Sequence, residues 1–153
     1  MRERSEILNA HTMSKFIVKS YSPKNQIQPH SFFVLNKGLN SGKPLMQPCP
    51  NSFVITSRNE DEMEFLFQLC KGLWQTKAFQ VFLVGSVIPF LLMDDFKYYL
   101  LEKSNQALND FEAHQKTIKT LRSLDDLEKQ FKQNLLLIAD ARRSIYHRYI
   151  KRL

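Results

Sequence analysis

Three short runs of β-branched and aromatic residues predict three strands in the first part of the chain. They are residues 15–21, 31–35 and 52–56, and turn-forming residues bound each of them. Residues 37–44, between the second and third runs, include two glycines, an asparagine, a serine and a proline, a composition that excludes a helix. We therefore expect a small antiparallel or mixed sheet that encloses one Gly/Pro-rich loop.

Apolar residues recur at steps of three and four between residues 60 and 75, which predicts a helix there. Asn59 followed by Glu62 is typical of an N-cap, and acidic side chains suit the positive end of the helix dipole. We expect the exposed face to carry Glu62, Gln68 and Lys71. The apolar face, expected to lie on the sheet, comprises Met63, Leu66, Phe67, Cys70, Leu73 and Trp74.

Two further apolar runs, residues 79–84 and 87–92, predict a β-hairpin. Gly85 and Ser86, which join them, suit a two-residue turn. Pro89 has no amide hydrogen, so the second strand is expected at a sheet edge or to be irregular there. The alternative is that Pro89 lies in the first turn of a helix.

The rest of the chain has a helical composition, without glycine or proline after Asp94. Ser123, which precedes two aspartates, is the best internal N-cap. The sequence therefore predicts helices over residues 94–122 and 124–150 that pair antiparallel. The fold class expected is α+β: a small antiparallel or mixed sheet with one packed helix, followed by a C-terminal helical hairpin.

The length and the composition indicate one domain with an aromatic core. The chain has 153 residues, with 12 Phe, 5 Tyr and 1 Trp. Residues 1–12 are polar and unpatterned, so we expect a disordered extension there, or a translation start at Met13, and a single domain over residues 13–153. The two cysteines, Cys49 and Cys70, lack zinc-ligand spacing and indicate thiols in a reduced compartment.

A cytoplasmic location is expected. The first residues lack the apolar core of a signal peptide. The longest uncharged run, residues 78–93, is shorter than a membrane-spanning helix and contains glycine, serine and proline. We therefore expect no membrane anchor.

The net charge of +7 is unevenly distributed. Residues 1–50 carry seven Lys/Arg against two Glu, residues 51–102 carry four against seven acidic residues, and residues 103–153 carry eleven against six. The two ends are basic and the middle is acidic. This asymmetry points to a polyanion or an acidic partner, although many basic proteins bind no nucleic acid.

The loop at residues 37–44 resembles a phosphate-binding loop in composition, but its spacing differs. A P-loop has four residues between its glycines and a Ser or Thr after the lysine, and a helix follows. Here three residues separate Gly38 from Gly42, and a proline follows Lys43. Nucleotide hydrolysis is therefore not expected. Lys37 and Lys43 are candidates for contacts to a nucleic-acid phosphate, and the alternative is a purely structural turn.

Residues 141–153 concentrate positive side chains and tyrosines at a predicted helix end. One interpretation is a solvated last turn whose cations complement the helix dipole, with Ile145 and Tyr149 packed inward. The other is a polyanion-binding face on which Tyr146 lies against a base or sugar. The candidate nucleic-acid-binding residues are Lys37, Lys43, Arg142, Arg143, Tyr146, Arg148, Lys151 and Arg152.

Catalytic and metal-ligating patterns are missing from the sequence. The four histidines are scattered: His11, His30, His114 and His147. They form no HExxH motif and no Cys/His group. Asp94 is explained more simply as a helix N-cap than as part of a carboxylate pair with Asp95. We expect no enzyme activity, no metal and no cofactor.

Three segments resemble the signature stretches of a known family. They are KGLNSGKP at residues 37–44, PCPNSF at 48–53 and GSVIPF at 85–90. They are similar to those of an uncharacterised family of small cytoplasmic proteins from gut anaerobic bacteria, often carried on mobile elements. The resemblance covers about residues 15–100. It implies a bacterial cytoplasmic setting and accessory work for a plasmid, conjugative element or phage, and it assigns no catalytic residue.

Two classes of function remain open. The first is a non-enzymatic nucleic-acid-associated accessory protein of a bacterial mobile element, although no helix-turn-helix, zinc finger or RNA-recognition signature is present. The alternative is a protein-binding module or antagonist that engages an acidic protein through the C-terminal helices. A continuous positive surface that joins Lys37, Lys43 and residues 142–152 would favour the first. Scattered charges would favour the second.

Overall fold

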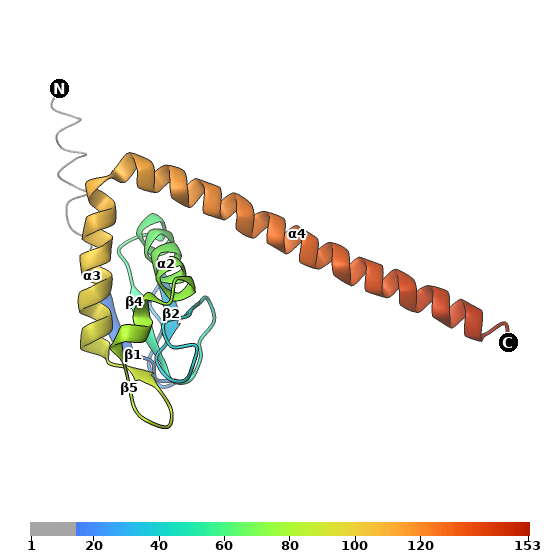
Figure 1. Cartoon of the computed structure of the whole chain (residues 1–153), viewed down its shortest axis with the longest axis horizontal. Helices are drawn as coiled ribbons and strands as arrows, with labels where there is room; N and C mark the ends of the chain where they lie inside the picture. Colours follow the sequence, from blue (N-terminus) through green and yellow to red (C-terminus); the bar gives the residue numbers. More distant parts are fainter. Residues whose placement is uncertain (1–14) are drawn as a thin grey trace. The chain divides into compact units, whose positions relative to one another are not determined.

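The computed structural model describes residues 15–153 (Figure 1). By its internal contacts the chain divides into two compact units, Met1–His114 and Gln115–Leu153. The extension expected at residues 1–12 lies outside the described residues. The single domain expected over residues 13–153 stays a prediction, and the two units are described in turn.

The first unit contains a four-stranded antiparallel sheet with the strand order β1-β4-β2-β3 (Figure 1). Its strands are β1 (Ile17–Ser20), β2 (Ser31–Leu35), β3 (Pro44–Leu45) and β4 (Ser52–Thr56). The three predicted strands are confirmed. The short β3 was not predicted, and it follows the Gly-rich loop directly. The α+β class is confirmed.

One face of the sheet forms the floor of the core. Successive side chains of a strand point to opposite faces, so alternate residues of neighbouring strands come together. Val18 of β1 pairs with Ile55 of β4, which also pairs with Phe32 of β2. Phe53 of β4 pairs with Val34 in the same way. All five side chains are buried in one cluster.

Helix α2 (Glu60–Gln75) packs on this face as predicted, through the buried Leu66 and Cys70. The predicted N-cap is confirmed, since Asn59 Oδ1 accepts a hydrogen bond from the Glu62 amide at 2.8 Å. The expected exposed face was wrong: Glu62 and Lys71 are half-buried, and Gln68 is buried. It follows Phe65 by three residues and so shares its side of the helix, where the His114 ring lies 4.6 Å from the Phe65 ring.

The predicted hairpin exists, but most of its first strand is replaced by a 3₁₀ helix. The elements are η1 (Ala78–Phe82), β5 (Leu83–Val84) and β6 (Phe90–Leu91), and β5 pairs antiparallel with β6. Phe79 is buried 5.5 Å from the ring of Phe96, an inward position that η1 provides. The turn spans residues 85–89 rather than two residues. Pro89 lies in this turn, where its carbonyl accepts the Gly38 amide at 2.7 Å.

The break between the last two helices was predicted at the wrong place. Helix α3 spans Met93–Asn109 and α4 spans Phe111–Ile150, so the break falls at Asp110. Asp110 Oδ1 accepts the Ala113 amide at 3.3 Å, which is N-cap geometry. Ser123 lies inside α4, and its hydroxyl donates to the Lys119 carbonyl at 3.2 Å. Helices of 17 and 40 residues replace the nearly equal arms expected of the hairpin.

The N-cap role expected for Asp94 was also wrong. Leu92 occupies the N-cap position of α3 and makes no side-chain capping bond. Asp94 and Asp95 lie inside the first turn instead, where the helix dipole favours their charge. α3 contributes Phe96 and Leu100 to the core.

Candidate functional site

The Gly-rich loop between β2 and β3 is a compact turn closed by its own backbone. Gly38 and Gly42 have φ values of 92° and 93°, a region that favours glycine. Four backbone amides of the loop donate to backbone carbonyls at 2.7–3.1 Å: those of Gly38, Ser41, Gly42 and Lys43. These four amides are therefore committed within the fold, and they do not form the cradle that an anion would need.

The two lysines of this loop have different environments. Lys37 is exposed, and its backbone forms a β-bridge with Phe90. Lys43 is half-buried, with Nζ 5.3 Å from the centroid of the Trp74 ring. A cation at this distance from an indole face is attracted by the ring. The loop thus uses Lys43 in a structural contact with α2.

A pocket of about 410 Å³ opens beside the same loop. Leu39 and Ser41 of the loop, Trp74 of α2, Lys77 and Phe79 are among the residues that line it. The lining offers apolar contacts, amide and hydroxyl groups and one ammonium group. The pocket was not predicted, because its lining comes from segments that are distant in sequence. The left-handed Lys77 (φ 61°) turns the chain between α2 and η1.

The described thiols and imidazoles lie apart from one another. Cys49 and Cys70 are free thiols, and burial raises the pKa of Cys70. Burial lowers the pKa of His114, whose Nε2 has no hydrogen-bond partner among residues 15–153. His30 and His147 are exposed, and His11 lies outside the described residues. Within the described part of the chain, no three His, Cys, Asp or Glu side chains gather as metal ligands.

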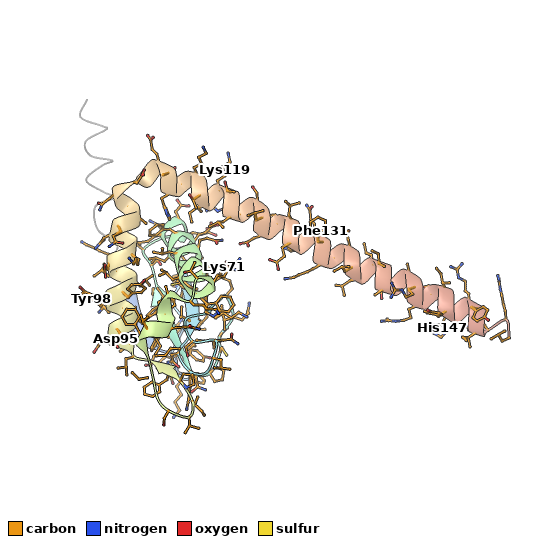
Figure 2. The ribbon with its side chains drawn as sticks, in the orientation of Figure 1. Lys71, Asp95, Tyr98, Lys119, Phe131 and His147 are labelled. Atoms are coloured by element: carbon orange, nitrogen blue, oxygen red, sulfur yellow. The ribbon has the colours of Figure 1, made fainter. Side chains whose placement is uncertain are left out.

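The second unit consists mainly of α4, a helix of 40 residues that starts at Phe111. Figure 2 shows its side chains, with Lys119, Phe131 and His147 labelled. From Leu121 on, positions at alternating steps of three and four form one stripe, here called the heptad stripe. Its members are Leu121, Leu124, Glu128, Phe131, Leu135, Ile138, Arg142, Ile145 and Tyr149.

The heptad stripe is apolar and exposed. Six of its seven apolar side chains, all except Leu121, are 54–66% exposed. The row of positions directly opposite the stripe, with the exposed Leu136 and Leu137 to either side of it, is polar: Lys119, Asp126, Gln133, Asp140 and His147. A mean step of 3.5 residues is the spacing of a coiled-coil seam. A long helix usually needs packing of its apolar face for stability, so this stripe is a candidate interface.

The three- and four-residue spacing of apolar residues along the stripe is visible in the sequence, but a helical hairpin was predicted for this region. Residues 124–150 were predicted to form a separate helix that pairs antiparallel with residues 94–122. With the break at Asp110, the stripe runs along one continuous helix. Glu128 and Arg142, the two charged members of the stripe, were not recognised as interface positions.

The candidate nucleic-acid-binding residues fall in both units. Lys37 and Lys43 belong to the first unit. The other six are exposed in the second unit, either in α4 or just after its end: Arg142, Arg143, Tyr146, Arg148, Lys151 and Arg152.

The cationic side chains within α4 do not share one face. A helix turns by about 100° per residue, so Arg143 and Arg148 point about 100° and about 240° away from Arg142. Arg142 belongs to the heptad stripe. Arg143 Nη1 lies 3.5 Å from Asp140 Oδ1.

Comparison with known proteins identifies a family. No curated protein and no solved structure matches the chain. No helix in the described part is long and apolar enough to cross a bilayer. The model of a family of unknown function, DUF6943, matches residues 18–148, so the similarity extends beyond residues 15–100 and includes most of α4. Since this match covers most of the 153 residues, the chain belongs to the DUF6943 family of unknown function.

Proposed function

We propose that this chain is a non-enzymatic protein-interaction module whose docking surface is the heptad stripe of α4. The observation that carries the proposal is the row of six apolar side chains, each more than half exposed, on a helix whose opposite positions are polar. Soluble monomers rarely expose contiguous apolar surface on this scale, and a patch with polar edges is typical of an interaction site.

The burial still available along the stripe is large enough for a specific complex. Full burial of a large apolar side chain contributes about 1.5–3 kcal/mol, so six side chains with about 60% of their surface exposed would contribute about 5–11 kcal/mol. Association costs on the order of 4–15 kcal/mol, and a partner adds its own apolar surface to the balance. The stripe therefore supports docking to a partner with a matching apolar surface.

The charged members of the stripe restrict the chemistry of that partner. Docking would cover Glu128 and Arg142, and a covered charge without a counter-charge is strongly destabilising. Glu128 has a counter-charge within the helix, since its Oε1 lies 2.7 Å from Lys132 Nζ. The partner must therefore present a carboxylate near Arg142, and a cation near Glu128 would add to the existing ion pair. This requirement makes the earlier prediction of an acidic protein partner more specific.

The proposal is tested by capture from nuclease-treated lysate with three forms of the full chain as bait. The stripe variant is Phe131→Glu/Ile138→Glu, and the matched control is Gln133→Glu/His147→Glu on the polar side. Each variant adds two negative charges. We expect the wild type and the control to retain the same proteins, an untagged copy of the chain included, and the stripe variant to lose them at least about tenfold. Equal capture by all three baits would refute the proposal.

A second candidate is a nucleic-acid-associated accessory role for a mobile element in the bacterial cytoplasm. The observation that favours it is the group of exposed cations at the end of the chain: Arg142, Arg143, Arg148, Lys151 and Arg152. Phosphate contacts carry no base information, so changing all five to Gln should weaken binding to every nucleic acid alike.

Titration of labelled single- and double-stranded oligonucleotides at two salt concentrations tests this candidate. Its affinity should fall with salt with a log–log slope of about −0.7 to −0.9 per phosphate neutralised. The matched control changes five other cations of α4 to Gln: Lys116, Lys119, Arg122, Lys129 and Lys132. A dissociation constant weaker than about 100 μM near physiological salt would rule the role out.

A further inference from the structure

We propose that the partner on the heptad stripe is a second copy of this chain, bound antiparallel through α4. This inference rests on the proposed function and identifies its partner. It is derived from the order of apolar and charged residues along the stripe.

An antiparallel pair centred between Leu135 and Ile138 uses the stripe from Leu124 to Tyr149. In such a pair, each residue at the first position of a heptad faces a residue at the fourth position of the other helix. The stripe from Leu121 to Tyr149 is about 42 Å long and covers about four heptads, which is long enough for a coiled coil. The facing residues at its centre are Leu135 with Ile138, Phe131 with Arg142, and Glu128 with Ile145.

The two charged members of the stripe become complementary in this arrangement. Glu128 of one copy lies one layer from Arg142 of the other, about 4.5 Å along the helix axis. By symmetry the pair forms twice. Arg142 also faces the Phe131 ring of the other copy, where a guanidinium is attracted by the ring. Each requirement placed on the partner is therefore met by the chain itself.

Glu128 already has an ion pair within its own helix, which Arg142 of the other copy would join. In the single chain its Oε1 lies 2.7 Å from Lys132 Nζ, with both side chains at least 60% exposed. An ion pair with such exposure contributes little.

The parallel arrangement is disfavoured by the same residues. In a parallel pair in register, Glu128 faces Glu128 and Arg142 faces Arg142. Two layers of the interface would then hold like charges, which is costly when water is removed. The order of charges along the stripe thus selects the antiparallel direction.

Sedimentation velocity of the purified, nuclease-treated full chain over a range of concentrations tests the inference. We expect a concentration-dependent species with twice the mass of one 18.1 kDa chain. Glu128→Arg alone and Arg142→Glu alone should each weaken dimerisation at least about tenfold, because each puts like charges side by side. The double variant should return to within about threefold of the wild type, since it restores the opposite charges.

Matched controls separate the contact from the change in net charge. Asp126→Arg makes the same charge change as Glu128→Arg on the polar side of α4, and Arg143→Glu does the same for Arg142→Glu outside the stripe. Both should dimerise as the wild type does. Thermal unfolding of each variant checks that the first unit stays folded, so a loss of dimer is assigned to the interface.

Several outcomes would overturn the inference. If the wild type stays monomeric at about 100 μM, a second copy of the chain is not the partner of the stripe. The same conclusion applies if the stripe docks on the first unit of its own chain. A dimer that both single variants leave intact, or that the double variant does not restore, excludes the antiparallel pairing. A doubled mass that appears only with added nucleic acid assigns the association to that ligand. The lysate capture still tests the proposed function in each case, because it detects partners other than the chain itself.

Discussion

Substitution of Gly42 by Ala should be among the most destabilising small changes in the first unit. Gly42 has a φ of 93°, and a Cβ there would lie 2.3 Å from Cδ2 and 2.9 Å from Cγ of Phe79. Phe79 has little room to move away, because its buried ring packs 5.5 Å from that of Phe96 and 6.0 Å from that of Tyr99. The alanine is therefore both strained and in collision.

Gly38 provides a matched control in the same loop. Its φ is 92°, but a Cβ there would meet no atom within 4 Å. Gly38→Ala therefore measures the backbone strain alone. The difference between the two variants isolates the contact of the loop with Phe79.

The expected magnitudes follow from these two terms. An alanine in this backbone region costs about 1–3 kcal/mol of stability. It also lowers the conformational entropy of the unfolded chain, which offsets about 0.4–1 kcal/mol of that cost. Overpacking against a buried ring adds about 1–3 kcal/mol for Gly42→Ala. The two variants should therefore differ by about 2–12 °C in Tm.

Urea unfolding followed by fluorescence measures the underlying difference in the free energy of unfolding, because the single tryptophan, Trp74, lies in the first unit beside the loop. Gly42→Ala should unfold at clearly lower urea than Gly38→Ala, with a similar slope. Equal midpoints for the two variants would refute the close packing of Phe79 against the loop.

Three other predictions concern the first unit. Partial burial favours the neutral form of Glu62, but the hydrogen bonds and charge of Arg58 lower its pKa below 4.5 on balance. The stability of the wild type should therefore fall as the pH falls below this value. The fall should be smaller in Glu62→Gln. Burial lowers the pKa of His114 below 6.5, so the wild-type Tm should drop between about pH 7.5 and about pH 5.5, and His114→Gln should flatten that drop. Trp74 is half-buried, so Trp74→Ala should cost about 2–3 kcal/mol, below the range for a fully buried tryptophan, as measured by urea unfolding with circular dichroism.

Local sequence signals predicted most of the first unit because they act over a few residues. The strand β2 and the helix α2 were placed at their observed bounds, since a short aromatic and aliphatic run and the pair Asn59 and Glu62 define them without help from the rest of the chain. Tertiary contacts decided the rest. Phe79 enters the core on a 3₁₀ turn, and Gln68 is covered on the side where Phe65 meets His114.

The candidate interface was predicted only in part, because the start of the long helix was placed at the wrong residue. Ser123 before two aspartates and Asp110 both carry helix-start chemistry, but a helix start was predicted only at Ser123. In the fold, Ser123 bonds back to Lys119 inside the helix, whereas Asp110 caps α4. The misplaced break separated only Leu121 from the rest of the stripe, because Leu124 to Tyr149, with Glu128 and Arg142 among them, lay in one predicted helix. The pocket beside Trp74 arises from segments distant in sequence and had no local signal.

The strand order of the sheet has a consequence for synthesis of the protein. β4, the last of the four strands to be made, lies between β1 and β2, so β1 has no neighbour until Thr56 has left the ribosome. During that interval the backbone hydrogen-bonding groups of β1 and β2 that later pair with β4 are open to other chains. A nascent chain stalled before residue 52 would hold these two strands without the one that joins them. Folding of this unit is therefore expected to begin late, when β4 enters the sheet and α2 follows it onto the core.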